Sequence, residues 1–351
     1  MSHTFARARI ALVAAAISLF TTLSACTPKD NAAGESADAA ASVMQVALVT
    51  AGSISDQGWN GGAYNGLLAI RDSLSAKISH IQSKTPAEYD ENFRQYGAQN
   101  YTIVFGHGFE FQEAAVRVAS QFPKTIYVIT SGRVVGPNVA GVAFAFEQAS
   151  YQAGVLAGAM TKSNIVGMIA GAEIPPVKIS FAAFERGATS VNPKVRVLTS
   201  YIGNWEDVSA GKELALTQIG QGADLIFQNA DAAGLGVFQA AKEKKILAFG
   251  ANANQNSVAP EVVVASVVID LPKAFMMIAR EVKAGSFKGR VIDLGVSDDV
   301  VRLEINPAFR ARIAATTIST IDSIGAALKA GTFRTLDDLL AGSDAASKVK
   351  P

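Results

Sequence analysis

From residue 43 onward, short apolar runs alternate along the chain with longer amphipathic stretches. The short runs are continuous and rich in β-branched residues, as in VALVT at 46–50. A strand with one solvated face would alternate apolar and polar residues, so continuous runs indicate parallel strands that helices cover on both sides. The pattern predicts strands at 46–50, 78–81, 101–106 and 125–130, separated by helices at 59–74, 92–98 and 111–121.

The same alternation then begins again in the second part of the chain. It predicts strands at 165–170, 196–201, 225–228 and 246–250, with helices at 181–190, 209–221 and 235–243 between them. Two such sets of about 100 residues each favour two similar α/β lobes over one long sheet.

The remaining C-terminal elements are fewer. Amphipathic helices are predicted at 271–285 and 318–330, the second ending at Gly331. Residues 290–294 and 300–305 predict a short hairpin with Ser297-Asp298-Asp299 at its bend. The last residues, 341–351, are small and polar, and we expect a loose tail there.

The first 25 residues have the pattern of a signal peptide. Arg7 and Arg9 precede an apolar stretch at 10–23, and Ser24-Ala25 supplies the small residues that signal peptidase needs. An apolar stretch of ~14 residues is shorter than the ~20 of a transmembrane helix. Cys26 follows at the cleavage point, as in the bacterial lipobox. We therefore predict that Cys26 becomes an acylated N-terminus, carrying palmitate-like chains that anchor the protein to the plasma membrane. The alternative is an ordinary signal peptide followed by an incidental cysteine.

Composition sets limits on the mature chain. Residues 26–43 are nearly all small or polar and predict a disordered tether between lipid and globule. The full chain has 31 basic and 30 acidic residues, and loss of the signal peptide leaves 29 basic and 30 acidic ones. The resulting net charge of −1 argues against nucleic acid as a partner. Cys26 is the only cysteine, so no disulfide stabilises the fold. A hydrophobic content of 49% is enough for the cores of two domains.

Ligands of open α/β sheets bind beyond the carboxyl ends of the strands, so the loops after the predicted strands are the candidate site. These loops are rich in aromatic, amide and hydroxyl groups and poor in charge. Such a lining favours a neutral, flat, hydrogen-bonding ligand over a phosphate or a metal ion. The loops cover residues 51–60, 106–110, 131–132, 201–207, 228–231 and 251–255.

Both tryptophans of the chain, Trp59 and Trp205, fall in these loops, one in each predicted lobe. Each indole could simply pack over the edge of its own lobe's core. Their equivalent positions favour a clamp in which the two rings face each other across a ligand. Stacking of a base on an aromatic ring is worth ~1–3 kcal/mol per face, against the ~8 kcal/mol of a micromolar dissociation constant.

Five further loop residues are candidates for contact with the ligand. Asp56 lies just ahead of a predicted helix, where it could contact the ligand, cap the helix at a gain of ~1 kcal/mol, or do both. Asn60 lies one turn into that helix, beside Trp59. Phe109 could instead turn the chain, and Asn229 and Asp231 could instead cap the next helix.

Four runs of the chain together carry a resemblance to a known family. They are SDQGWN at 55–60 with AYNG at 63–66, GHGF at 106–109, GVLAG at 154–158, and GLGVF at 234–238 with AA at 240–241. In this order, from about residue 46 to 285, they resemble the basic membrane protein (BMP) lipoproteins. These are substrate-binding proteins of ABC importers that include the purine nucleoside receptors.

The resemblance implies the α/β fold of type I periplasmic-binding proteins, in which two lobes with parallel sheets are joined by crossover strands. We accordingly expect an N-terminal lobe of residues 44–143 and 267–285 and a C-terminal lobe of residues 144–266 and 286–340. The lobes would close around a small-molecule ligand and deliver it to an ABC permease and ATPase complex. We expect a monomer in the cell envelope, facing the periplasm or the outside.

The resemblance also implies roles for single residues. The family's two base-stacking aromatic residues fall on Trp59 and Trp205. Its acidic positions fall on Ala51, Ser131 and Asn252, and a lysine position falls near Ile269. An amide accepts hydrogen bonds less strongly than a carboxylate. Ser131 and Asn252 are therefore expected to contact a free purine base or similar heterocycle, with a nucleoside as the second choice.

The sequence favours binding over catalysis. His3 leaves with the signal peptide, and the remaining His80 and His107 belong to no HExxH, GxSxG or phosphate-loop pattern. We expect no metal and no cofactor, and a structural or hydrogen-bonding role for His107. A nucleoside-processing enzyme is the less favoured alternative. A surface lipoprotein of the same fold that acts as a sensor or interaction protein for another solute also remains open.

Overall fold

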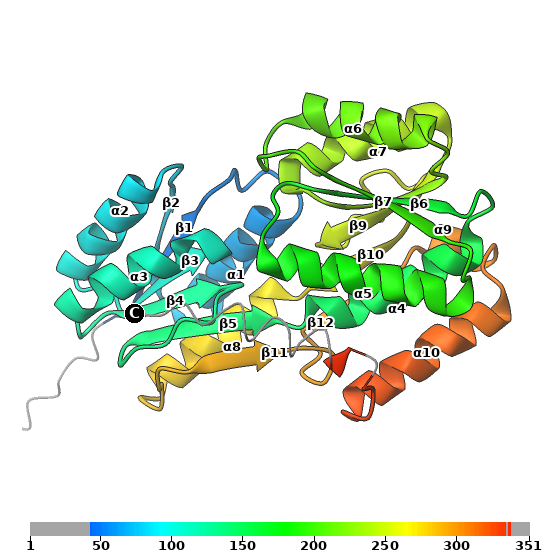
Figure 1. Cartoon of the computed structure of the whole chain (residues 1–351). Helices are drawn as coiled ribbons and strands as arrows, with labels where there is room; N and C mark the ends of the chain where they lie inside the picture. The colour runs from blue at the N-terminus through cyan, green and yellow to red at the C-terminus, as the bar shows by residue number, and fades with distance from the viewer. Residues whose placement is uncertain (1–42, 335, 338–351) are drawn as a thin grey trace, which may run out of the picture. The chain divides into compact units, whose positions relative to one another are not determined.

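Two six-stranded sheets organise the part of the chain that the structure, a computed structural model, describes: residues 43–334 and 336–337 (Figure 1). The described residues belong to one compact unit that begins at Val43. The predicted signal peptide, Cys26, almost all of the tether and the tail at 341–351 lie outside them. Within the described residues, no helix has the length and apolar character that crossing a membrane requires.

The first sheet is parallel throughout, with strand order β11-β5-β4-β3-β1-β2. Nearly every residue of its central strands is buried, which explains why their apolar runs do not alternate. The strands are β1 (Gln45–Thr50), β2 (Lys77–Gln82), β3 (Ile103–His107), β4 (Ile126–Thr130), β5 (Val139–Phe144) and β11 (Val291–Leu294).

Helices cover both faces of the first sheet. On one face α1 (Trp59–Leu74) packs beside α8 (Leu271–Lys283), whose Phe275 stacks on Phe105 of β3 with ring centroids 4.1 Å apart. The side chain of Val104 points to the opposite face, into a core shared with α2 (Pro86–Ala98) and α3 (Gln112–Val118). Short 3₁₀ turns, η1 (Phe109–Phe111) and η2 (Ala119–Gln121), flank α3.

The second sheet has strand order β12-β10-β9-β8-β6-β7, and only its edge strand β12 is antiparallel. Helices α4 and α5 pack on one face of this sheet, and α6 and α7 pack on the opposite face (Figure 1). The strands are β6 (Ile165–Ala170), β7 (Arg196–Tyr201), β8 (Leu225–Asn229), β9 (Leu247–Asn252), β10 (Val263–Ile269) and β12 (Val301–Ile305). The helices are α4 (Phe146–Met160), α5 (Pro175–Val191), α6 (Val208–Gly220), η3 (Asp231–Ala233), α7 (Gly234–Lys244), α9 (Pro307–Arg310) and α10 (Ala315–Lys329).

Glycines allow α4 and α5 to pack with their backbones in contact. A Cβ atom on Gly154 would overlap the carbonyl oxygen of Phe184, and one on Gly187 would overlap that of Tyr151. The GVLAG run at 154–158 therefore has a packing role, in the middle of a helix where glycine would otherwise cost stability.

Several sequence predictions need correction. The predicted hairpin is wrong: β11 pairs with β5 in the first sheet, and β12 pairs with β10 in the second. Each sheet has an open edge that accepts one strand, and the turn at 295–300 carries the chain from one sheet to the other. Residues 286–340 are thus shared between the sheets and do not form part of the C-terminal lobe alone, while the remaining lobe boundaries stay a prediction.

Some elements were missed and several helices begin earlier than predicted. No strand or helix was expected where β5, α4 and the short α9 lie. Helix α2 begins at Pro86 and not at 92, because Thr85 and Glu88 form a capping box at its start. Helix α5 begins at Pro175 and not at 181.

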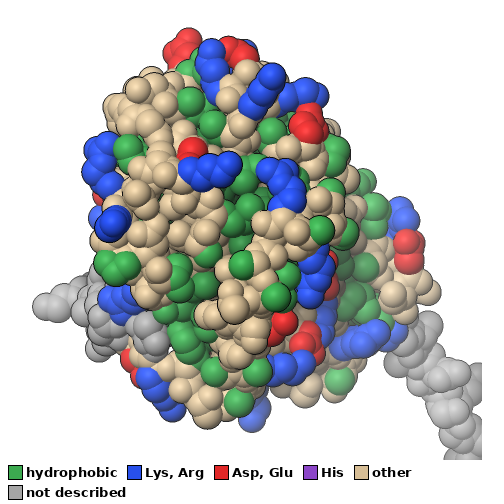
Figure 2. Space-filling model, turned by 90° about the vertical axis from the view of Figure 1, so that its right-hand side faces the viewer, with side chains coloured by type: hydrophobic (Ala, Val, Ile, Leu, Met, Phe, Trp, Pro, Cys, Tyr) green, Lys and Arg blue, Asp and Glu red, His purple; other side chains and the backbone are tan. Residues whose placement is uncertain are grey.

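Charged groups are dispersed over the face of the molecule that Figure 2 shows. Figure 2 shows basic side chains on one face lying among acidic, polar and apolar ones. On this face they are not gathered into one basic patch.

The packing of α4 on α5 gives a first test. Gly154→Ala should lower the free energy of unfolding by about 1–3 kcal/mol, because the added methyl group has to displace the backbone of α5. Gly220→Ala is the matched control, since a Cβ atom there meets open space. It should leave stability unchanged or raise it by up to about 1 kcal/mol. Urea unfolding followed by circular dichroism measures both, and equal stability of the two variants would contradict the backbone contact.

Candidate ligand-binding site

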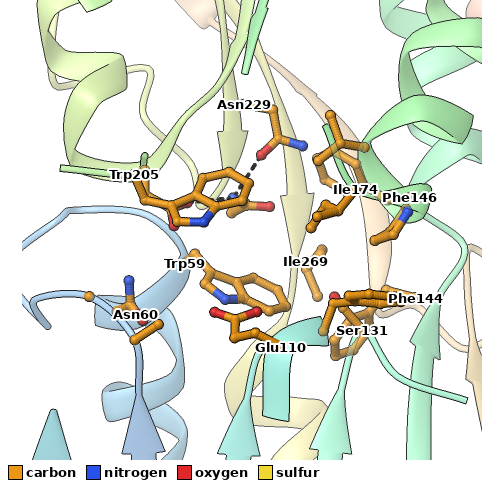
Figure 3. Close-up of a pocket in the computed structure, with 18 residues that line it drawn as sticks. Trp59, Asn60, Glu110, Ser131, Phe144, Phe146, Ile174, Trp205, Asn229 and Ile269 are labelled. Carbon is orange, nitrogen blue, oxygen red and sulfur yellow. Dashed lines mark hydrogen bonds between the residues drawn. The ribbon is translucent and has the colours of Figure 1, made fainter. Parts of the chain in front are cut away.

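A pocket lies where the strand ends of both sheets meet (Figure 3). It has an empty volume of about 650 Å³, counting the space that is open to solvent. Residues from both halves of the fold line it: Ala51, Gly52, Trp59, Asn60, Gly108, Phe109, Glu110, Ser131, Phe144, Phe146, Ile174, Pro176, Val177, Trp205, Asn229, Asp231, Asn252 and Ile269.

The structure brings most of the predicted site residues together in this pocket. Eight of the nine line it, and Asp56 does not. Those eight are Trp59, Asn60, Phe109, Ser131, Trp205, Asn229, Asp231 and Asn252. Their contact with a ligand stays a prediction.

Asp56 organises the start of α1. Its carboxylate is buried and accepts hydrogen bonds from the backbone N–H groups of Gly58, Asn60 and Gly61 at 2.7–2.9 Å. It also accepts one from the side-chain amide of Asn60 at 2.8 Å. Of the two roles considered for Asp56, the structure shows helix capping, and through it Asp56 fixes Asn60 in the pocket wall.

Trp59 is held from behind by His107, whose ring stacks on the indole at a centroid distance of 3.9 Å. Nε2 of His107 lies 3.0 Å from the carbonyl oxygen of Trp59, and Nδ1 lies 2.9 Å from Oγ1 of Thr130. The carbonyl can only accept, so Nε2 donates and Nδ1 accepts from the hydroxyl. Burial lowers the pKa of His107 to about 3 despite the bond to Trp59, and the ring is neutral.

Trp205 follows β7 and lies against the backbone after β6. A Cβ atom on Gly171 would overlap the indole, so glycine is required there for Trp205 to lie flat on the chain. Figure 3 shows the indoles of Trp205 and Trp59 on opposite sides of the pocket, each reaching it from a different half of the fold.

Neighbouring strand ends supply a polar wall. Asn229 ends β8 and Asn252 ends β9, and these strands pair in parallel. The side-chain amide of Asn252 donates to Oδ1 of Asn229 at 3.2 Å and to Oδ1 of Asp231 at 3.3 Å. Asp231 and Asn252 both have positive φ, as does Ser131 on the opposite wall. Such backbone strain is common at functional sites.

Burial, followed by the negative charges of Asp56 and Glu110, raises the pKa of Asp231 well above its ordinary value. Burial likewise raises the pKa of Glu110. The carboxyl group of Glu110 folds back over Gly108, whose φ of 148° suits glycine. The pocket therefore contains two desolvated carboxyl groups.

Sequence reasoning missed part of the lining. Glu110 was in a candidate loop but was not singled out, although a charged residue between Phe109 and Phe111 was a usable signal. Phe144 and Phe146 lie where no strand or helix was expected. Ile174, Pro176 and Val177 lie at the start of α5, which was placed too late in the chain.

Side chains outside the pocket lining also connect the two halves. The amide of Gln82, at the end of β2, donates to the carboxylate of Glu206 at 3.0 Å, and Nζ of Lys84 lies 3.7 Å from it. A second link is the hydrogen bond from the side-chain amide of Gln255, after β9, to the backbone oxygen of Gln57, before α1, at 3.2 Å.

Two sheets whose strand ends face one pocket, with three chain crossings between them, define a two-lobed binding protein of the type I periplasmic-binding fold. A solute-binding protein of an ABC transporter system from Aeropyrum pernix K1 has this fold, with a TM-score of 0.77 and 18% identity. The match covers 87% of this chain and 98% of that one. The predicted fold class is confirmed.

The model of the family described as "ABC transporter substrate-binding protein PnrA-like" matches residues 43–322, and the chain belongs to this family. It is 30% identical over 238 residues to the ABC transporter nucleoside-binding protein BmpA of Lactococcus lactis, a match that covers 66% of this chain and 68% of the relative. It is 26% identical over 248 residues to the transcriptional activator protein med of Bacillus subtilis, covering 70% and 77%. The resemblance to BMP proteins is confirmed, and the family is one of substrate-binding proteins.

The neutral state of His107 can be tested directly. Its ring should remain uncharged from about pH 7 to about pH 5, because its pKa lies far below the ordinary value of ~6.5. Nitrogen chemical shifts of a mature protein labelled at histidine report this, since His80 and His107 are its only histidines. A His107→Gln variant assigns the signals. A His107 titration midpoint near pH 6.5 would contradict the buried stack.

Proposed function

We propose that the protein is a membrane-anchored substrate-binding lipoprotein of an ABC importer. It binds a purine base or nucleoside-like heterocycle by stacking it between Trp59 and Trp205. The observation that carries the proposal is that the chain's two tryptophans line one pocket from opposite halves of the fold. Each indole is held on its far side, Trp59 by His107 and Trp205 by the chain at Gly171, which supports a rigid clamp.

The lining supports a base over a nucleoside. Ala51, Ser131, Asn252 and Ile269, where the family resemblance implies three acids and a lysine, all line the pocket. None of these four side chains can form the charge-assisted bonds that a carboxylate makes to ribose hydroxyls. The name of the relative from Lactococcus lactis favours a nucleoside, which stays the second choice.

Anchoring and delivery follow from the N-terminal segment. A lipid on Cys26 would keep the binding domain next to its permease and ATPase in the cell envelope. The hydrogen bond from Gln82 to Glu206 and the ion pair of Lys84 with Glu206 join the two halves of the fold. They support closure of these halves over the ligand.

A role as a sensor is the second candidate, and one observation favours it. A relative with 26% identity is named a transcriptional activator protein, so the family's fold also occurs in a protein named for regulation. An ATPase gene and permease genes beside the gene for this protein would favour import over sensing.

Removal of either indole tests the clamp. Trp59→Ala and Trp205→Ala should each weaken binding of the best purine ligand at least about fivefold, since stacking is worth ~1–3 kcal/mol per face. Titration calorimetry measures the affinities and thermal melting checks the fold. Val116→Ala, at an exposed apolar residue on α3, is the control and should bind normally. Normal affinity in either tryptophan variant would rule out the clamp.

A second titration separates base from nucleoside. Adenine, guanine, hypoxanthine and xanthine are each compared with the matching nucleoside. We expect each base to bind more tightly, because the pocket lacks acids at the three positions that the family resemblance assigns. Tighter binding of all four nucleosides would contradict the preference for a base over a nucleoside, but it would not contradict stacking between the two tryptophans.

The lipid anchor is tested through the only cysteine. Cys26→Ser should release the protein from the membrane fraction into the soluble envelope fraction, while the ligand affinity of the released protein is unchanged. Fractionation with immunoblotting, together with metabolic labelling by a palmitate analogue, checks both points. Continued membrane attachment of the variant would exclude lipidation at Cys26.

A further inference from the structure

The pocket is lined by acidic side chains and by no basic one among the residues that the structure describes. Glu110 and Asp231 both line it, and Asp56 lies behind its wall. No lysine, arginine or histidine is among the lining residues that the structure describes. Asp231 is 8% exposed, and its one side-chain partner in the structure is the amide of Asn252, at 3.3 Å.

Basic side chains on the surrounding elements form ion pairs outside the pocket. Lys84 lies 3.7 Å from Glu206, Arg302 3.6 Å from Asp270, Lys178 2.9 Å from Glu173, and Arg133 3.1 Å from Asp293. The imidazole of His107 behind Trp59 is neutral. Within the described residues no basic side chain pairs with Glu110 or Asp231, so a positive charge beside them is left for the ligand to supply.

Two amide oxygens of the wall are open to a hydrogen-bond donor. Asn60 is 2% exposed, and its Oδ1 is buried without a hydrogen-bond partner. The amide cannot be turned round, because its NH₂ group donates to the carboxylate of Asp56. Asn252 donates through its NH₂ group to Asn229 and Asp231, so its own oxygen remains free to accept. A ligand that fits these acceptors is rich in N–H groups.

The aromatic faces suit the same ligand. The electron-rich face of an indole attracts a cation, by ~2 kcal/mol or more where water is excluded. A metal ion fits poorly, since no group of three histidine, cysteine or acidic side chains among the described residues could hold one. The positive charge is better placed on a flat ring between the two indoles.

We propose that the pocket selects a nitrogen heterocycle that carries a positive charge and N–H donors, with Glu110 and Asp231 as its counter-ions. This inference rests on the proposed function, whose ligand class it narrows. The acids lie at Glu110 and Asp231 and not at the three positions expected from the family resemblance.

Proton release accompanies binding. Both carboxyl groups have raised pKa values in the empty pocket, so they hold protons to higher pH than free carboxyls do. A bound cation favours their charged form and lowers these pKa values, so protons leave as the ligand binds. Affinity for a permanent cation should therefore rise with pH. A neutral base that accepts hydrogen bonds from the protonated acids would show the opposite dependence.

Isomeric probes test the charge. 1,9-Dimethyladenine is a cation at neutral pH, and its isomer N6,9-dimethyladenine is neutral. 1-Methylnicotinamide and nicotinamide form a second pair of different shape. In titration calorimetry with the mature protein, we expect at least one cation to bind tenfold or more tightly than its neutral partner. Its affinity should rise between about pH 5 and about pH 8.

Variants assign the effect to the two acids. Glu110→Gln and Asp231→Asn should each reduce the preference for the cation at least fivefold, and thermal melting checks that both variants fold. Glu113→Gln is the matched control, because Glu113 lies on the adjoining helix with its side chain 81% exposed. It should keep the preference.

The outcomes separate this inference from the proposed function. The inference is overturned if neither cation binds more tightly than its neutral partner, or if affinity falls as pH rises. Binding of neutral purines in that case would leave the proposed function intact. Absence of binding by all four probes and by every natural purine base and nucleoside would overturn both.

Discussion

The meeting of strand ends from two separate parallel sheets is the constraint on which the rest of the structure depends. A parallel sheet presents the loops after its strands along one edge, and here two such edges face one pocket. The chain passes between the sheets at three points: after β5, after β10 and after β11. Each half alone would have a single tryptophan on an open edge.

Parts of the fold could be predicted where the residues of an element themselves determine its bounds. The predicted bounds of α1, β6 and β7 coincide with the observed ones, because strong apolar periodicity and clear turn residues mark them. The partners of β11 and β12 could not be predicted. Their pairing depends on which distant sheet edge is open, and this information is absent from residues 291–305 themselves.

Some residues of the pocket could be predicted from the sequence and others could not. Trp59, Trp205 and the amides after β8 and β9 were found because strand ends could be located from the sequence. Residues of the pocket at the start of α5 were missed because the loop after the strand predicted at 165–170 was not among the candidate loops. The neutral platform under Trp59 also needed the structure, since it depends on two hydrogen bonds that His107 makes to Trp59 and Thr130.

The ion pair between Lys84 and Glu206 is a weak link between the two halves of the fold. Glu206 is 47% exposed and Lys84 is 65% exposed, and an ion pair this exposed contributes about 1 kcal/mol or less. Salt screens such a pair further. A contact this weak cannot by itself fix the separation of the two sheets, so that separation depends on the three chain crossings between them.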